Sequence, residues 1–181
     1  MRFTETNLKG SFIIDIEEKS DRRGFFARSF CSREFSEHGL EGSIVQSNIS
    51  LNHHKGTLRG MHFQRSPHEE VKIVRCTRGA IFDVMLDLRP ESPTYLRWIG
   101  QELTEDNHRT LYIPKRFGHG FQTLTDNAEV MYMVTQFYAP GHAGGLPYND
   151  PAFGIKWPLE VTSISDADAS WPRYSGPIFE R

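Results

Sequence analysis

The segment GTLRGMHFQ, residues 56–64, brings one imidazole and one guanidinium into an apolar stretch that alternates like a β-strand. Arg59 and His62 are three residues apart, so a regular strand would point their side chains to opposite faces. Gly60 lies between them and permits a β-bulge that would turn both side chains inward. His62 is then either a hydrogen-bonded histidine of the strand wall or a catalytic base, and the residue alone favours the wall.

Metal coordination is the obvious alternative use of histidines in such a chain. Small β-barrels often hold a metal with a His-x-His pair, a later histidine and a carboxylate. Here His62 is followed by Phe63 and Gln64, and a strand would point the adjacent His53 and His54 in opposite directions. This spacing disfavours a transition-metal site, and we expect no metal.

Three further positions carry side chains for which a chemical role competes with a structural one. Lys72 lies in the apolar segment VKIVRC, where a lysine is either paired and used or directed to solvent. His119 lies between two glycines in KRFGHGFQTL, where the backbone can approach a ligand closely or simply turn. Asp168 follows Ser165 by three residues, and this spacing alone favours a helix-capping box over chemistry.

Short alternating segments bounded by turn residues dominate the chain and predict strands at residues 11–17, 24–30, 43–51, 71–76, 80–88, 95–103, 110–114 and 129–138. A helix is predicted over residues 32–40, with Ser32 as N-cap and Gly39 as its stop. The tail from Gly141 is rich in proline and glycine, and we expect it to wrap the body with a helical turn near residues 165–169. Many strands with almost no helix indicate an all-β sandwich or barrel.

The last predicted strand, EVMYMVTQFY, has two different faces. Alternation puts methionines and a phenylalanine on the face that we expect to pack between sheets: Met131, Met133 and Phe137. The other face carries Tyr132, Gln136 and Tyr138, which suit the lining of a pocket. Its alternative is a row of half-exposed tyrosines facing solvent, and the pattern alone slightly favours that alternative.

Composition and charge narrow the class of protein. The 181 residues are 38% hydrophobic and 24% charged, which is typical of one globular domain with a packed core. A net charge of −2 argues against a nucleic-acid partner. Local arginines could still clamp an anionic ligand, or could only solvate the surface: Arg22, Arg23, Arg28, Arg59 and Arg75. No leader or membrane-spanning run is visible, so we expect no membrane partner and a cytoplasmic location.

The two cysteines, Cys31 and Cys76, do not form a spaced metal set. Cys76 lies in a strand-like segment and has the character of a small core residue. Nothing in the chain demands a disulfide between them, although the sequence leaves that pairing open.

Several motifs occur in the order found in one enzyme family: TLRGMHFQ, KIVRCTRGAIFDVMLDLRPESPTYLRW, LYIPKRFGHGFQTL, EVMYMVTQFYAP and YNDPAFGIKWP. Through them the chain resembles the dTDP-4-dehydrorhamnose 3,5-epimerase family, from DRRGFF near residue 21 to DADASWP near residue 172. The resemblance implies a single all-β domain over residues 1–181, a cupin-type jelly-roll barrel with short peripheral helices. It also implies an isomerase that works as a homodimer with exchanged N-terminal strands, without metal or cofactor.

The family inverts C3 and C5 of a nucleotide-linked 4-keto-6-deoxyhexose by removing and returning protons beside the ketone. By resemblance His62 is the base, and Asp168 orients its ring and stabilises the imidazolium. Tyr132 occupies the position of the acid that protonates the opposite face. Lys72 matches the cation beside the C4 oxygen, where the charge of the enolate develops.

The resemblance also implies a set of residues that bind the nucleotide-diphosphate sugar. Arg59 and His119 match positions that line the sugar and diphosphate pocket, and Tyr138 matches an aromatic residue that stacks on the nucleotide base. Nucleotide contacts completed across the dimer are expected from Arg23, Gln46 and Asn48. Arg28 is expected to act on the same side of the site.

Three departures from the family pattern cluster on that nucleotide side. Arg28 stands where the familiar motif has a glutamate, Ser47 replaces an acidic residue, and Ala167 replaces the lysine before the dyad aspartate. Since a guanidinium and a carboxylate select different partners, CDP- or GDP-linked sugars compete with the thymidine nucleotide. Three further functions stay open: an epimerase acting at only one carbon, a metal-dependent cupin oxygenase and a non-catalytic sugar-nucleotide-binding cupin.

Overall fold

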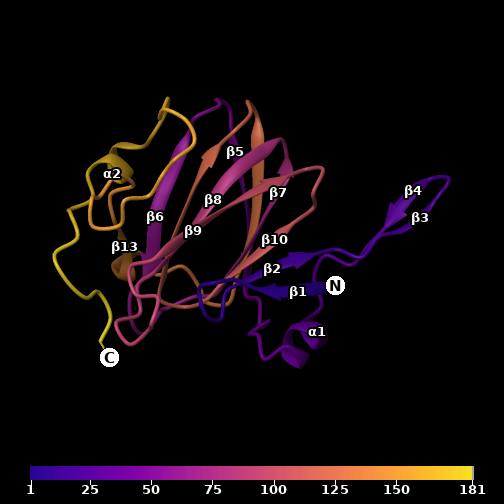
Figure 1. Ribbon diagram of the computed structural model, residues 1–181, viewed down its shortest axis with the longest axis horizontal. Helices are drawn as coiled ribbons and strands as arrows, with labels where there is room; N and C mark the ends of the chain where they lie inside the picture. Colours follow the sequence, from indigo (N-terminus) through magenta and orange to yellow (C-terminus); the bar gives the residue numbers. More distant parts are fainter. Residues whose placement is uncertain (181) are drawn as a thin grey trace.

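Two antiparallel sheets that face each other form the body of the protein in this computed structural model, which describes residues 1–180 (Figure 1). The first sheet has the strand order β1 (Arg2–Glu5), β2 (Phe12–Asp15), β10 (Thr110–Ile113), β7 (Lys72–Arg78), β12 (Ala128–Val134) and β5 (Gln46–Asn52). The second has the order β13 (Ala143–Gly145), β6 (Leu58–Gln64), β11 (Phe117–Thr123), β8 (Ala80–Asp87) and β9 (Trp98–Thr104). This architecture confirms the predicted all-β jelly roll.

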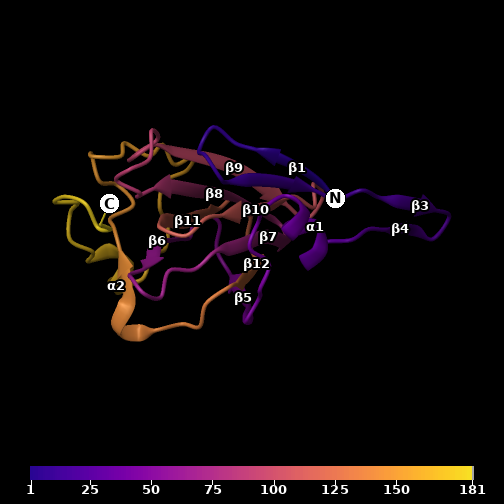
Figure 2. The same cartoon turned by 90° about the horizontal axis from the view of Figure 1, so that it is seen from below.

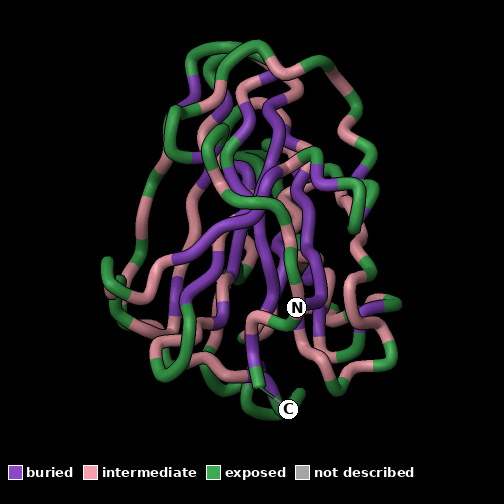
Figure 3. Tube along the Cα trace, turned by 90° about the vertical axis from the view of Figure 1, so that its left-hand side faces the viewer, coloured by how far each residue is buried: buried purple, intermediate pink, exposed green. Residues whose placement is uncertain are grey.

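The core lies between the sheets because each strand sends alternate apolar residues to its inner face. Val74 and Val130 from the first sheet and Met85 from the second belong to one buried cluster. The outer face of the first sheet packs against α1 (Ser32–Glu37), and the C-terminal segment covers the outer face of the second. Figure 3 shows the buried residues concentrated along the central strands and the exposed residues in the peripheral loops.

Strand β12 lines the cavity with Tyr132, as predicted, but its methionine face does not pack between the sheets. Val130 and Tyr132 face the core between the sheets, while Met133 packs under α1 on the outside. The strand also ends at Val134, and Phe137 beyond it is 61% exposed. Alternation alone cannot distinguish two half-apolar faces, because a helix that covers the outer face makes both of them partly buried.

Most other predicted elements are present with shifted ends. The helix begins at Ser32, but Cys31 is its N-cap and Ser32 is not; Gly39, at φ +70°, follows its end as expected. The predicted strand 24–30 shrinks to β4 (Gly24–Phe26), which pairs only with β3 (Lys19–Asp21). Strand β9 begins three residues after the predicted start because the residues before it form a turn, with Leu96 at φ +60°.

The β3–β4 hairpin projects away from the two sheets in both views (Figures 1 and 2). Its strand β4 exposes two apolar side chains, since Phe25 is 46% and Phe26 is 70% exposed, while the turn at its tip is formed by Arg22 and Arg23. At the opposite end, the chain after η1 (Pro140–His142) forms β13 and later α2 (Asp166–Ala169). Helix α2 confirms the helical turn that was predicted near residues 165–169. Among the described residues, no helix has the length and apolarity that a membrane crossing needs.

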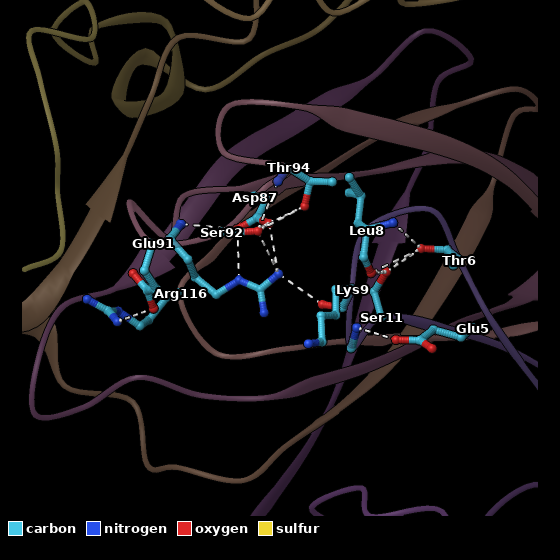
Figure 4. Close-up of polar contacts among 12 residues, drawn as sticks. Glu5, Thr6, Leu8, Lys9, Ser11, Asp87, Glu91, Ser92, Thr94 and Arg116 are labelled. Atoms are coloured by element: carbon cyan, nitrogen blue, oxygen red, sulfur yellow. Dashed lines mark hydrogen bonds and ion pairs between the residues drawn. The ribbon is translucent and has the colours of Figure 1, made fainter. Parts of the chain in front are cut away.

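The loop after β8 is held by a buried carboxylate (Figure 4). Asp87 accepts hydrogen bonds from Arg89 Nε at 2.8 Å and from the hydroxyls of Ser92 and Thr94 at 2.6 and 2.7 Å. Arg89 also donates to the carbonyl of Lys9 at 2.9 Å, which ties this loop to the β1–β2 turn. Burial alone would raise the pKa of the Asp87 carboxyl, but these hydrogen bonds together lower it.

Candidate active site

A cavity of about 410 Å³ opens between the two sheets and collects most of the predicted chemical residues. It is lined by Ile49, Ser50, Leu51, Arg59, His62, Lys72, His119, Gly120, Phe121 and Tyr132. Lys72 and Tyr132 come from the first sheet, and His62 and His119 from the second, where they are cross-strand partners. The jelly roll therefore places a histidine and a tyrosine on opposing walls of one space.

Strand β6 delivers both Arg59 and His62 to this cavity through the predicted bulge. His62 pairs with His119 but Arg59 pairs with Phe121, so three steps along β6 match two along β11. Gly60, at φ +118°, makes this possible, because a β-carbon there would lie 2.6 Å from the Cα of Gly120.

His62 and Asp168 form a hydrogen-bonded dyad. Nε2 of His62 lies 2.6 Å from Oδ1 of Asp168, and the backbone N–H of Gly60 donates to Oδ2 at 3.0 Å. A bridge between Thr57 and Ser163 aligns the C-terminal segment with β6 and so brings Asp168 to the histidine. The imidazole is 41% exposed and the carboxylate only 7%, so the ring faces the cavity and the carboxylate is shielded.

The charge state of the dyad follows from these contacts. Burial would raise the pKa of Asp168, but its hydrogen bonds to His62, Gly60 and Trp171 lower it, so the carboxyl is ionised at neutral pH. An ionised carboxylate only accepts, so Nε2 of His62 carries the proton and Nδ1 is the basic nitrogen. Nδ1 has no hydrogen-bond partner within residues 1–180.

Helix capping and the dyad coexist at Asp168. The backbone N–H of Asp168 donates to Ser165 Oγ at 3.1 Å, which is the predicted cap of α2. The carboxylate turns instead toward β6 and the histidine. The two interpretations of this residue from sequence therefore use different atoms of it.

Tyr132 and Lys72 share the wall opposite the dyad. Lys72 Nζ lies 3.1 Å from Glu70 Oε1, and both side chains are largely buried, with 14% and 10% exposed. Burial raises the pKa of the Tyr132 phenol, and the negative charge of Glu70 raises it further. Tyr132 is therefore protonated at neutral pH and available as a proton donor. A histidine, a protonated tyrosine and a lysine around one cavity can together support proton transfer next to a carbonyl group.

Comparison with known proteins identifies the family of this chain. The family model for dTDP-4-dehydrorhamnose 3,5-epimerase matches residues 5–175. The chain belongs to the dTDP-4-dehydrorhamnose 3,5-epimerase family. A family member from Methanothermobacter thermautotrophicus is 43% identical over 98% of this chain and 97% of its own. It follows that the protein is an epimerase, as the motifs predicted.

Two solved structures show the same fold. The Bacillus anthracis dTDP-4-dehydrorhamnose 3,5-epimerase, with TDP and pyrophosphate bound, is 39% identical with a TM-score of 0.92, covering 96% of this chain and 99% of that one. ChmJ from Streptomyces bikiniensis, a 3′-monoepimerase in complex with dTDP-quinovose, is 30% identical with a TM-score of 0.86, covering 93% of this chain and 85% of its own.

A second histidine–carboxylate pair lies at the cavity of the epimerase. His119 Nε2 is 2.9 Å from Oδ2 of Asp83, whose side chain is fully buried. Burial raises the pKa of Asp83, and the neighbouring His119 and Lys72 offset that only in part. The contact with Asp83 fixes the orientation of the His119 ring through Nε2. The other ring nitrogen, Nδ1, can then be presented to a ligand.

Several predicted binding residues lie outside the cavity of a single chain. Arg23 forms an ion pair with Asp21 in the hairpin, and Arg28 pairs with Glu34 near the N-terminus. Tyr138 is 64% exposed, and its backbone N–H donates to Gln46 Oε1 at 2.8 Å.

Asn48 is the strand neighbour of Tyr132, so it shares the inner face of the sheet without lining the cavity. The predicted common strand face of Tyr132 and Tyr138 is wrong, because β12 ends at Val134.

Sequence reasoning missed three residues around the site. Glu70 is two positions before Lys72, and this spacing along an extended chain could have predicted their contact. Asp83 alternates with Ile81 and Met85 on the apolar face of β8, which is itself a sign of a buried polar group. No local pattern singles out Trp171, because only the folded tail brings it to Asp168.

Within residues 1–180, no group of three or more histidine, cysteine, aspartate or glutamate side chains is arranged to hold a metal ion.

Proposed function

We propose that this epimerase inverts C3 and C5 of a dTDP-linked 4-keto-6-deoxyhexose through an enolate intermediate. The observation that carries the proposal is the position of His62 and Tyr132, which reach one cavity from opposing sheets. Inversion requires a proton to leave one face of the sugar and another to arrive on the opposite face. A single acid–base group would return the proton to the face it left.

The first half-reaction uses the dyad and the lysine. Nδ1 of His62 takes the proton on C3, and the electron pair of that C–H bond forms a double bond to C4 while the ketone oxygen becomes an enolate. The ammonium of Lys72 stabilises this oxygen, and removing one such donor costs roughly 3 kcal/mol. The carboxylate of Asp168 stabilises the imidazolium that results.

Reprotonation completes the inversion. The phenol of Tyr132 donates its proton to C3 from the other face: the electron pair of the C3–C4 double bond forms the new C–H bond, a lone pair of the enolate oxygen re-forms the ketone, and a phenolate remains. The proton on His62 leaves to solvent, and solvent reprotonates the phenolate, so that no proton is gained or lost. The same groups then act at C5 once the ring has turned within the cavity. We assign sugar and diphosphate contacts to Arg59 and His119.

Deuterium counting tests this proposal. The purified protein is incubated in heavy water with dTDP-4-keto-6-deoxyglucose, and the recovered sugar is examined by mass spectrometry and NMR. We expect two deuterons, one at C3 and one at C5, with His62→Ala as the control that incorporates none. The proposal fails if the wild-type protein incorporates none, and parallel CDP- and GDP-linked substrates decide which nucleotide base is accepted.

A one-carbon reaction is the second candidate, because the chain resembles ChmJ, which is described as a 3′-monoepimerase. Both reactions use the same base and acid, and they differ in whether the sugar can turn between two steps. In the same experiment, one deuteron at C3 with C5 unchanged identifies this candidate.

We propose further that the epimerase is a homodimer in which each N-terminal hairpin reaches the cavity of the partner. The hairpin projects from the body (Figure 2), and Phe25 and Phe26 are exposed on its strand β4. Beside the cavity, Ile49 on the edge strand β5 is 68% exposed. Two exposed apolar surfaces on one chain favour burial in an assembly. The nucleotide contact expected from Arg23 then belongs to the partner's site.

Complementation between inactive variants tests this exchange. Arg23→Ala and His62→Ala subunits are co-expressed with different tags, and the mixed dimer is isolated. If Arg23 serves the partner's cavity, the mixed dimer has one intact site and regains activity that neither parent shows. If Arg23 serves its own chain, both sites stay defective and activity does not return. A cytoplasmic location stays a prediction from the sequence.

A further inference from the structure

Asp168 has one polar partner that the proposed mechanism leaves unused, the indole of Trp171. Nε1 of Trp171 donates to Asp168 Oδ1 at 3.2 Å, and the same oxygen accepts from His62 at 2.6 Å. The Gly60 N–H occupies Oδ2 at 3.0 Å. Donors on both oxygens fix the plane of the carboxylate. The indole of Trp171 and the imidazole of His62 compete for the same oxygen, Oδ1.

Strand β13 makes room for this indole. Gly145 is the cross-strand partner of His62, and a β-carbon at Gly145 would collide with the ring of Trp171. The adjacent Gly144 faces the other way, where a β-carbon would lie 2.6 Å from the Phe63 ring. The ring of Trp171 therefore packs directly against the strand pair that carries the base.

We propose that Trp171 is a positioning residue of the dyad. Its indole N–H donates to Asp168 Oδ1 and so weakens the hydrogen bond between that oxygen and the imidazolium of His62. The proposal rests on the proposed function, because it matters only if His62 takes up a proton. A hydrogen bond to an ionised carboxylate stabilises the charged form and lowers its basicity. A less basic carboxylate lets the imidazolium release its proton more readily, which each turnover requires.

The environment of Asp168 agrees with this role. Burial pushes the pKa of the carboxyl up, while the hydrogen bonds from His62, Gly60 and Trp171 push it down, with a net lowering. Without the indole, the His62 hydrogen bond would meet a more basic oxygen, which would hold the imidazolium more tightly.

Trp171→Phe removes the N–H and keeps an aromatic ring. We expect kcat to fall about fivefold with KM changed less than about twofold, since one hydrogen bond of the dyad is lost. The acid limb of kcat/KM against pH should move up by about half a unit, because the imidazolium is held more tightly. A purely structural role would lower the thermal midpoint and leave the acid limb in place.

Trp157→Phe is the matched control. Trp157 lies in the same C-terminal segment, and its Nε1 donates at 2.9 Å to the backbone carbonyl of Tyr148, which is not part of the dyad. This variant loses the same kind of hydrogen bond and should keep the wild-type pH profile. If the Trp171→Phe and Trp157→Phe profiles both superimpose on that of the wild type, the proposal is overturned.

Gly145→Ala is a second route to the same result if Trp171→Phe fails to fold. Its β-carbon displaces the indole without removing it, so the acid limb should again move up, whereas Gly144→Ala should affect only stability. An unshifted acid limb in a folded Gly145→Ala protein overturns the proposal. An inactive wild-type protein would instead refute the proposed function, which keeps the two failures distinct.

Discussion

Replacing Asp168 with asparagine separates catalysis from helix capping at one position. The carboxylate oxygen lies 2.6 Å from His62 Nε2, and the side chain is 7% exposed, so the attraction to an imidazolium is poorly screened. Loss of a hydrogen bond between charged groups costs about 1.5–3 kcal/mol. The amide can also donate to Nε2, which would leave the proton on Nδ1 and remove the base. Together these effects predict a loss of about 4 kcal/mol, or roughly a thousandfold in kcat.

The same substitution has a smaller effect on stability. The backbone N–H that caps on Ser165 is retained, so α2 keeps its first hydrogen bond. The pKa of Asp168 is lowered by folding, so the carboxyl stabilises the folded state above its ordinary pKa of 3.8, and that contribution is lost as pH falls through the folded value. We expect Asp168→Asn to lose about 1–2 kcal/mol of unfolding free energy at pH 7.

The assay pairs deuterium incorporation with urea unfolding at pH 7. Ser165→Ala is the matched control, because it removes the cap acceptor and leaves the carboxylate. It should cost about 1 kcal/mol of stability and change kcat by less than about threefold. If Asp168→Asn matches Ser165→Ala in stability and keeps kcat within about tenfold of the wild type, the dyad argument is refuted and the Asp168 carboxylate has only a structural role.

Three other substitutions give measurable outcomes. Tyr132→Phe should retain deuterium exchange in recovered substrate within about tenfold while inversion falls at least about a hundredfold, and unimpaired inversion would assign the acid elsewhere. Glu70→Gln removes a negative charge that raises the pKa of Tyr132, second to the effect of burial. The basic limb of the profile of kcat against pH should therefore move to lower pH, and an unmoved limb contradicts this. Asp87→Asn should cost about 3 kcal/mol in urea unfolding at pH 7 with kcat unchanged, since it removes the fully buried carboxylate that pairs with the guanidinium of Arg89. The stability contributed by the Asp87 carboxylate should vanish below the pKa of that group in the folded protein, which lies under 3.8. Arg2→Ala removes an exposed ion pair and is the control, which should cost under about 0.5 kcal/mol.

The sequence predicted the class of fold and much of the chemistry. Alternating segments separated by turn residues specify strands, because only an extended chain sends every second residue to one side. Gly60 between Arg59 and His62 was enough to predict a bulge, since glycine tolerates the close approach and positive φ that the bulge needs. The motifs around these residues identified the family, which the comparisons confirm.

Other features depended on segments distant in the chain. The methionine face of β12 was wrongly predicted to lie between the sheets, because α1, far away in sequence, covers it on the outside. The contact of Asp168 with His62 spans 106 residues and depends on how the tail docks along β6. Trp171 became visible only through that docking.

Sequence by itself determined which side chains can transfer protons and that they stand on strands, because residue type and alternation are local properties. Tertiary structure alone decided which of them meet. Cross-strand register and the path of the C-terminal segment set those distances, and neither is encoded in any single stretch of the chain.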